Sequence, residues 1–446
     1  MTRRTTCTGL LFALLAAPAF ADGFAPHEAV IRIVPGASID DINADLGTTV
    51  IDSIPRERTY LLHVPDGLNE EQFEEMLEHD PRIQSAELND EAGTPGGQTQ
   101  SFYLGVAPAA FDEQYTWNTV VPGGISGSSN GAGVIVAIID TGIDATHPIF
   151  AGHTILQGVD LLDNDDLPDD TADGIDNDDD SFIDEMHGHG TFQSALIAQL
   201  APGATLLPIR ALDSDGQGSA FTIAKAIYAA IDGGADVINM SLAMSYRNEI
   251  IEHAIEHATR DGILVVASAG NRGGDRKLYP AGFSDVIAVA STDADDVLSS
   301  FSCYGSHIDL CAPGSALVSA VPAGAFGQSD GTSGAAALVS ATAAVMKSAN
   351  THLSRSALKQ RLLHSCVDIS AHNQSIAQKI GAGRLDLTTS LDTAIGNGDI
   401  NLDGVTNYDD LTLLLYAWGS DDEAADVNLD GVVGYTDLML LLAHIH

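Results

Sequence analysis

An aspartate, a histidine and a serine lie in three short motifs of this chain, each within two residues of a glycine. They are Asp140 in Ile-Ile-Asp-Thr-Gly, His189 in His-Gly-Thr and Ser333 in Gly-Thr-Ser-Gly-Ala-Ala. A serine hydroxyl is a weak nucleophile near neutral pH. It needs an imidazole to take its proton and a carboxylate to orient that imidazole and stabilise its charge. The three side chains therefore predict hydrolysis through a serine nucleophile.

The sequence around each motif predicts an element that can position the side chain. Val134–Ile139 is a continuous apolar run, which is typical of a strand buried on both faces of a parallel sheet. Asp140 follows at its carboxyl end, where open α/β sheets place their sites. Helical patterns begin near His189 and Ser333, and the amino-terminal partial charge of the second helix, predicted from Gly334 to about Met346, favours negative charge near the serine oxygen.

The motifs and their order resemble those of the subtilisin-like serine proteases, over roughly Tyr115 to Ala394. The resemblance implies an α/β fold with a mostly parallel central sheet flanked by helices. It also implies a triad of Asp140, His189 and Ser333, with the Asn271 side chain stabilising the oxyanion. An edge that pairs with extended peptide substrate is implied as well. The substrate-binding residues expected from the resemblance are Ser241, Leu242, Ala243, Ala269 and Gly270.

The chain departs from the family pattern beside these residues. The serine motif continues Gly-Ala-Ala-Ala-Leu instead of Met-Ala-Ala-Pro-His, Phe192-Gln193-Ser194-Ala195 follows the histidine motif, and Ala243 replaces a usual glycine. These changes alter packing and leave the catalytic groups in place. They keep a second interpretation open, a calcium-dependent binding or scaffold protein with an inactive protease-like domain. His187 also precedes a glycine, but only His189 begins His-Gly-Thr, so His187 is interpreted as a loop residue or an ion ligand.

The first 97 residues contain the patterns of a signal peptide and of a domain that keeps the enzyme inactive. Residues 1–21 combine two arginines, an apolar stretch and Ala-Phe-Ala, which is typical of a cleaved signal peptide and predicts secretion. Residues 22–97 alternate strand and helix patterns, which predicts a small α+β domain, and the resemblance implies a removable propeptide that blocks the cleft. An accessory domain that stays attached is the alternative. The turn-rich Glu91–Gly97 predicts a cleavable junction before the peptidase domain, residues 98–395.

Charge and cysteine content limit the partners and the covalent links. The chain has 19 basic and 62 acidic residues, a net charge of −43, which disfavours nucleic acid and anionic membranes as partners. After the signal peptide, no apolar run approaches the roughly 18 residues of a membrane span. Polypeptide substrates are implied by the family resemblance. Removal of Cys7 leaves three cysteines, and a Cys303–Cys311 disulfide with Cys366 unpaired is one arrangement that fits.

An acidic insert, Asp160–Glu185, separates the catalytic aspartate and histidine motifs. Aspartates at alternate positions can supply several of the six to eight oxygens that Ca²⁺ takes. One calcium site is expected here, and a solvated acidic loop is the alternative. The candidate ligands are Asp176, Asp178, Asp180, Phe182, Asp184 and Glu185.

The carboxyl-terminal residues 396–446 contain a repeated Asp-x-Asn-x-Asp-Gly loop, with its two copies 27 residues apart. Each loop has ligand types at positions 1, 3, 5, 7 and 12, and a leucine-rich helix follows it. Loop and exit helix, occurring twice, resemble a dockerin module, a small all-α calcium-binding repeat. The resemblance implies two calcium ions and a cohesin-like or other docking protein as partner. The expected ligands are Asp399, Asn401, Asp403, Val405 and Asp410 in the first loop and Asp426, Asn428, Asp430, Val432 and Asp437 in the second.

Overall fold

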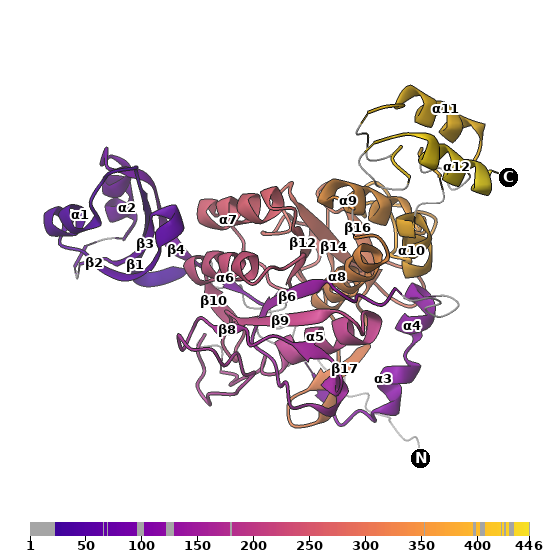
Figure 1. The fold of residues 1–446 in the computed structure, drawn as a ribbon. Coiled ribbons are helices and arrows are strands. Elements are labelled where there is room, and N and C mark those ends of the chain that lie inside the picture. Colours follow the sequence, from indigo (N-terminus) through magenta and orange to yellow (C-terminus); the bar gives the residue numbers. More distant parts are fainter. Residues whose placement is uncertain are drawn as a thin grey trace, which may run out of the picture.

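The computed structural model shows an amino-terminal domain, a large central domain and a carboxyl-terminal pair of helices (Figure 1). It describes residues 23–65, 67–68, 70–95, 102–121, 129–178, 181–351, 353–395, 398–401, 406–420, 422, 425–427 and 432–445. The expected signal peptide, residues 1–21, lies outside this part of the chain. Within the described ranges, no helix has both the length and the apolar character needed to cross a membrane.

The central domain is organised around a parallel sheet in the order β16-β14-β12-β11-β6-β9-β7, with β8 also paired to β9. This confirms the predicted mostly parallel α/β fold. Strand β6 is paired in register with β9 on one side and β11 on the other, so it lies deep inside the sheet. The strands are β6 (Ile135–Asp140), β7 (Thr154–Ile155), β8 (Val159–Asp160), β9 (Thr205–Arg210), β11 (Val237–Met240), β12 (Leu264–Ser268), β14 (Val286–Thr292) and β16 (Leu310–Pro313).

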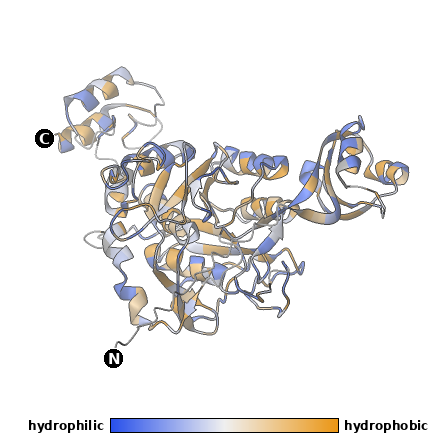
Figure 2. Ribbon diagram, turned by 180° about the vertical axis from the view of Figure 1, so that it is seen from behind, coloured by the Kyte–Doolittle hydropathy of each residue, from blue (hydrophilic) through white to orange (hydrophobic). Residues whose placement is uncertain are grey.

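Helices cover both faces of this sheet, which explains the uninterrupted apolar runs. Val136 and Ile138 of β6 face one core with α5 and α8, whereas Ala137 and Ile139 face the other with α6 and α7. Figure 2 shows the resulting concentration of hydrophobic residues in the central strands. The helices of this domain are α3 (Ala109–Glu113), α4 (Tyr115–Val120), α5 (His189–Leu200), α6 (Ala220–Asp232), α7 (Glu249–Arg260), α8 (Thr332–Ala349), α9 (Arg355–His364) and α10 (Leu387–Ile395).

Short strands complete the central domain at its rim. The hairpin β17–β18 pairs with β5, and β13 pairs with β15. The strands are β5 (Tyr103–Leu104), β10 (Gln217–Ser219), β13 (Gly274–Asp275), β15 (Cys303–Tyr304), β17 (Leu317–Val321) and β18 (Ala325–Ser329), and a 3-10 helix, η2, spans Pro148–Phe150.

The amino-terminal domain is an antiparallel sheet with two helices packed on one face. Strand order is β4-β1-β3-β2, and Phe73 and Leu77 of α2 and Ile42 of α1 fill a core of its own. Its elements are β1 (Phe24–Ile33), α1 (Ile39–Leu46), β2 (Thr49–Ile54), the 3-10 helix η1 (Pro55–Glu57), β3 (Thr59–His63), α2 (Glu70–Glu78) and β4 (Ile83–Gly93).

Two features of this domain differ from the sequence expectations. Strand β2 was not predicted, because its apolar residues Val50, Ile51 and Ile54 do not alternate with polar ones as they do in a half-buried strand. The expectation of a turn-rich junction over Glu91–Gly97 is wrong for its first part. Strand β4 continues to Gly93 because it pairs with β10 of the central domain. Tertiary pairing overrides the local turn signal there.

The carboxyl-terminal tail contains two helices, as the loop–helix repeat predicts. They are α11 (Tyr408–Tyr416) and α12 (Tyr435–His444). Leu414 and Leu441 are fully buried between them, with Val433 and Ile400 from the loops. The tail therefore has a small apolar core of its own, set apart from the central domain (Figure 1).

Candidate active site

The Asp140 and His189 motifs meet at the carboxyl end of β6. His189 Nδ1 lies 2.7 Å from Asp140 Oδ1, and that same oxygen accepts the Thr141 N–H at 2.8 Å. Both side chains are buried. A Cβ at Gly190 would lie 2.1 Å from Gly142 O, so the glycines of the two motifs allow their backbones to touch. With the proton on Nδ1, His189 presents the Nε2 lone pair to the cleft.

Ser333 lies in the first turn of α8, where the sequence placed it. Its backbone carbonyl accepts a hydrogen bond from Ser241 Oγ at 3.1 Å. Ser241 Oγ in turn accepts from Asn239 Nδ2 at 3.0 Å, and Asn239 Oδ1 accepts from Ser340 Oγ at 2.9 Å. This buried chain of hydrogen bonds ties the start and the middle of α8 to β11, and it restricts where the Ser333 hydroxyl can lie.

Asn271 is oriented so that its amide N–H₂ group faces the cleft. Its Oδ1 accepts from both the backbone N–H and the hydroxyl of Thr332, at 2.8 Å each. Because the Thr332 N–H requires an acceptor, the amide oxygen must face it and the nitrogen must point away. Asn271, His189 and Ser333 line one pocket. The preceding Ala269 and Gly270 lie beside it, and Gly270 N–H is bonded to Thr332 Oγ1.

Gln193, one of the departures from the family pattern, contacts the catalytic imidazole. Its Nε2 lies 3.2 Å from His189 Nε2, so the amide donates to the lone pair that would accept the Ser333 proton. Gln193 is buried one helical turn after His189 on α5. The departure from the family pattern thus lies in direct contact with the His189 imidazole.

The end of the amino-terminal domain occupies the cleft as an added strand. Gly93 and Ala243 exchange two backbone hydrogen bonds, of 3.0 and 2.7 Å, while β4 pairs with β10 on its other side. The Thr94 N–H is bonded to Gly216 O, and Pro95 O accepts from the Asn271 N–H at 3.2 Å. The methyl group of Ala243 does not prevent this pairing, because it points into the buried core.

Of the three predicted substrate-edge residues, Ala243 pairs with the peptide segment, whereas Ser241 and Leu242 make their printed hydrogen bonds within the central domain. All three are fully buried in this state. Pro95 lines the same pocket as His189 and Ser333. The amino-terminal segment therefore ends in the pocket that His189, Asn271 and Ser333 line.

A residue that the sequence analysis did not single out, Asp170, connects the aspartate and histidine motifs. Its carboxylate accepts from Thr141 Oγ1, from the Gly188 N–H, and from both the backbone and hydroxyl of Thr191, at 2.7 to 3.1 Å. His187 donates to the Asp170 carbonyl, so it lies in a loop contact here. In the sequence, Asp170 is one of many acidic residues in the insert, and its buried hydrogen bonds to both motifs are visible only in the structure.

The acidic insert brings some of its predicted ligands together. Carboxylate oxygens of Asp176 and Asp178 lie within 4.8 Å of each other and of Asp215, which follows β9 and was not predicted. Asp184 accepts from the backbone N–H groups of residues 173 and 174, so it closes the loop. Phe182 is exposed, Glu185 is buried, and Asp180 lies outside the described residues. All three clustered ligands are oxygens, which fits Ca²⁺.

In the tail, the aspartate at position 12 of each loop accepts hydrogen bonds from backbone N–H groups of the same loop. Asp410 is fully buried, and its two oxygens accept from the N–H groups of Ile400, Asn401 and Asn407 at 2.8 to 3.0 Å. Asp437, equally buried, accepts from the Gly434 N–H at 2.7 Å. Asp399, Asn401, Asp426 and Val432 belong to the described loops, whereas Asp403, Val405, Asn428 and Asp430 lie outside the described residues.

The Cys303–Cys311 disulfide is contradicted by the structure, in which all three described cysteines are thiols. Cys303 lies on β15 and contacts Gly273 O, whereas Cys311 lies on β16 and donates to Ile380 O at 3.3 Å. Each thiol therefore has a backbone carbonyl of its own as neighbour. Burial raises the pKa of both, and it raises the pKa of Cys366 to about 12. All three thiols are therefore poor nucleophiles.

Comparison with known proteins agrees with this geometry. The model of the Subtilase family matches residues 131–398, and that of the Fervidolysin N-terminal prodomain matches residues 21–89. Thermitase of Thermoactinomyces vulgaris is 39% identical over 230 residues, covering 49% of this chain and 77% of thermitase. A thermophilic serine proteinase of Bacillus sp. (strain AK1) is 35% identical over 295 residues, covering 63% of this chain and 67% of that protein.

A solved structure is similar across most of the fold. Fervidolysin from Fervidobacterium pennivorans, described as a keratinolytic enzyme related to subtilisin, superposes with a TM-score of 0.68 at 21% identity. The match covers 84% of this chain and 62% of that chain, so this chain spans less than two thirds of fervidolysin. At this identity the likeness shows a shared fold.

Proposed function

This chain belongs to the subtilase family of serine proteases, and from that premise we propose that it is a secreted endopeptidase made as a latent precursor. Ser333 is the nucleophile, His189 the general base and then acid, and Asp140 the carboxylate that orients the imidazole. The Asn271 amide and the Ser333 N–H stabilise the oxyanion. Polypeptides are the substrates, bound along Ser241, Leu242 and Ala243 with Ala269 and Gly270 beside the reacting carbonyl.

The observation that carries this proposal is the path of the segment Gly93–Pro95. It runs antiparallel to Ala243 by backbone hydrogen bonds alone, which is how a sheet edge recognises peptides of varied sequence. The Pro95 carbonyl then reaches the Asn271 N–H, in the pocket that also holds His189 and Ser333. The peptide bond after Pro95 is therefore the bond expected to be cut when the precursor matures.

In the reaction, His189 Nε2 takes the Ser333 proton while Oγ attacks the substrate carbonyl carbon. The carbonyl oxygen becomes an oxyanion, which the Asn271 amide and the Ser333 N–H stabilise. His189 then gives its proton to the leaving amine, and water repeats the sequence to release the acyl group. Before Nε2 can accept this proton, Gln193 must give up its contact with it.

Comparison of the wild-type chain with Ser333→Ala tests this proposal. We expect intact mass measurement to show the wild-type chain cut between Pro95 and Gly96, and the variant to remain whole while keeping the same circular dichroism spectrum. Cutting that persists in a homogeneous variant preparation would remove Ser333 from this role. A wild-type chain that stays whole and hydrolyses no peptide would favour the alternative, an inactive binding or scaffold protein.

The remaining domain assignments belong to the same proposal. The removable inhibitor was predicted as residues 22–97, and the proposed cut moves its end to Pro95; the peptidase then follows to residue 395, and residues 396–446 are a dockerin-like module that tethers the enzyme to a cohesin-like or other docking protein. Exposed apolar residues on α11 and α12, Tyr416 and Tyr435 among them, support a docking surface. The tethering role is tested by fusing residues 396–446 to a fluorescent protein. If these residues alone bind the docking protein, the fusion should bind it as well as the full-length chain does.

Calcium is the ion that the acidic loops fit. Asp176, Asp178 and Asp215 would hold it in the insert, and the oxygen ligands of the two tail loops would hold two more. Bound calcium would neutralise carboxylates that otherwise repel one another, so it would stabilise each loop.

A further inference from the structure

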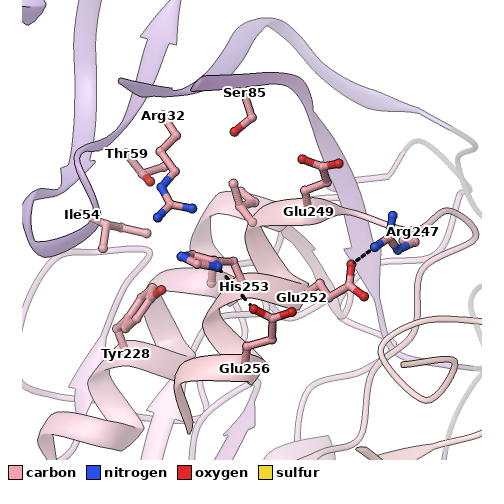
Figure 3. A pocket seen from close by; sticks show the side chains of 12 residues that line it. Arg32, Ile54, Thr59, Ser85, Tyr228, Arg247, Glu249, Glu252, His253 and Glu256 are labelled. Carbon is pink, nitrogen blue, oxygen red and sulfur yellow. Dashed lines mark ion pairs between the residues drawn. The ribbon is translucent and has the colours of Figure 1, made fainter. Parts of the chain in front are cut away.

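The amino-terminal domain, here called the prodomain, also contacts the outer faces of α6 and α7, far along its surface from the cleft. Arg56 pairs with Asp232 at 2.6 Å and Lys225 with Asp52 at 2.5 Å across this contact. A pocket of about 180 Å³ remains between the two domains. Figure 3 shows His253 of α7 next to Arg32 of the prodomain, with Glu256 paired to His253 and Tyr228 of α6 at one side.

We propose that Glu57, His253 and His257 form a zinc site that bridges the prodomain and the peptidase domain. Glu57 comes from η1 of the prodomain, and the two histidines come from α7. The histidines are four residues apart, so their imidazoles lie on one face of the helix, one turn apart. Two imidazoles and a carboxylate are a ligand set that zinc prefers, and Ca²⁺ does not take nitrogen ligands of this kind.

Each imidazole lies beside one oxygen of the Glu57 carboxylate, at a separation close to that of two ligand atoms on one zinc ion. Glu57 Oε2 lies 3.3 Å from His253 Nε2, and Glu57 Oε1 lies 3.5 Å from His257 Nδ1. All three ligand groups lie within 4.8 Å of one another. Two atoms bound at about 2.1 Å to a tetrahedral zinc are about 3.4 Å apart. The same separations are long for direct hydrogen bonds, and His253 Nε2 has no hydrogen-bond partner among the described residues.

The surroundings provide charge of both signs and room for a fourth ligand. Arg32 Nη2 is 3.7 Å from Glu57 Oε2, and Glu256 Oε2 is 3.6 Å from His253 Nδ1. An acceptor at Nδ1 raises the basicity of a histidine that ligates through Nε2. Each histidine side chain is 26% exposed. His253 also lines the pocket of about 180 Å³ between the domains, which has room for a water molecule because one molecule needs only roughly 10–15 Å³.

A site shared by two domains couples metal binding to prodomain docking. The docked form offers all three ligands, whereas separation of the domains removes Glu57. Zinc therefore stabilises the docked form by a factor of about 100 when its concentration is 100 times the dissociation constant. The proposed consequence is that zinc prolongs latency after the chain has been cut, and that its removal speeds release of the prodomain.

Zinc titration of the full-length Ser333→Ala chain tests the proposal without requiring any catalysis. The chain is first stripped with chelator and then kept in excess Ca²⁺, which fills the oxygen sites. We expect calorimetry to show one zinc per chain, and Co²⁺ to give the visible absorption of a tetrahedral site. Adding His253→Gln and His257→Gln should weaken zinc binding by more than about 100-fold, because two direct ligands are lost.

The matched control is His63→Gln, which removes an imidazole from the stacked pair that His27 and His63 form elsewhere on the prodomain. This control should bind zinc like the parent chain. If the double histidine variant does not fold, Glu57→Gln serves in its place and should show the same loss. Absence of zinc binding in the parent chain, or equal binding in the parent and the cluster variants, would overturn the proposal. The proposed protease function would remain unaffected by either result.

Discussion

The catalytic cleft and the carboxyl-terminal tail both bury aspartates, but they use them differently. Asp140 shares its Oδ1 between His189 and the Thr141 N–H, and it lies on a strand inside the central sheet. Asp410 uses both oxygens to accept backbone N–H groups of its own loop. In the proposed mechanism, the first carboxylate orients an imidazole that changes its protonation during the reaction. The second organises the loop in which it lies.

This difference predicts where each kind of substitution acts. The cleft is assembled from elements far apart in sequence, and the peptidase core is large enough to hold them when one side chain is shortened. The tail has only a small apolar core. Substitutions in the cleft should therefore change turnover while the fold persists, and substitutions in the tail loops should change folding while turnover persists.

The largest expected effect is that of Ser333→Ala on turnover. Loss of the nucleophile should lower kcat by about 10⁶-fold, the magnitude found for the serine of subtilisin. Steady-state hydrolysis of a peptide amide by the matured enzyme measures it, with the variant matured by added wild-type enzyme. Thermal unfolding should be unchanged within about 1 kcal/mol. A Ser333→Ala variant that keeps a tenth of the activity would contradict the assignment of Ser333 as the nucleophile.

Asn271→Ala should have the next largest effect. It removes one donor aimed at charge that develops in the transition state, so kcat should fall by about 10² to 10³-fold, as for subtilisin, while KM changes little. The backbone N–H of Thr332 also loses an acceptor in this variant. Asn271→Asp keeps that acceptor and lacks the amide N–H₂ group, so it is the matched control and should also be slow. A loss confined to KM would assign Asn271 to substrate binding.

On the tail side, replacing Asp410 and Asp437 by Ala should abolish a calcium-dependent folding transition. Each substitution leaves buried N–H groups without their acceptor, at a cost of about 1 to 3 kcal/mol, and removes a proposed ligand. Circular dichroism of residues 396–446, with chelator and then with Ca²⁺, measures the transition. The matched control is Asp409→Ala, which removes an exposed carboxylate next to Asp410. Loss of peptidase activity in the full-length double variant would contradict the separation of the two regions.

The smallest effect concerns pH and the docked prodomain. Glu87 caps the start of α7 by accepting from the Glu249 N–H at 2.9 Å, and burial raises the pKa of Glu87 to about 7. Free Glu titrates near 4.5, so between these values the docked form holds the extra proton. Docking must then weaken as pH rises through this window, by up to about tenfold per unit. Above about pH 7, no further change from this group is expected.

Size-exclusion chromatography of the processed chain at pH 5 and pH 8 measures this dependence. More prodomain should remain bound at pH 5. Glu87→Gln keeps an oxygen acceptor for the helix end and cannot ionise, so its retention should vary less between the two pH values. Equal pH dependence in both proteins would remove Glu87 as its source.

The sequence predicted the cleft well because each motif carries its own structural context. The apolar run before Asp140 forms β6, and the small residues after Ser333 form α8. Contacts between residues far apart in the sequence could not be predicted from local motifs. Asp215, which lies near Asp176 and Asp178, is 37 residues after Asp178 in the sequence. Gly93 belongs to a strand because it pairs with β10 and with Ala243. Both the aspartate cluster and the extension of β4 depend on contacts between residues far apart in the sequence. No local sequence pattern predicts such contacts.

The structure explains why residue 334 differs from the family signature, which the sequence motif alone does not. The family signature has a methionine there, whereas this chain has Gly334. A Cβ at this position would lie 2.4 Å from Leu317 Cδ1. Leu317 of β17 thus fills the space that a larger residue would require. The two residues compensate for one another, and Ser333 keeps its place at the start of α8.

Covalent labelling with a fluorophosphonate tests the central claim most directly, because this probe reacts with a serine that its own active site activates. The matured wild-type chain is labelled, digested and analysed by mass spectrometry, beside the uncut precursor and the Asp140→Asn and His189→Ala variants. We predict one label, on Ser333, that appears when the prodomain is released and is lost in both variants. A label on another residue, or labelling of Ser333 that persists without His189, would contradict the account.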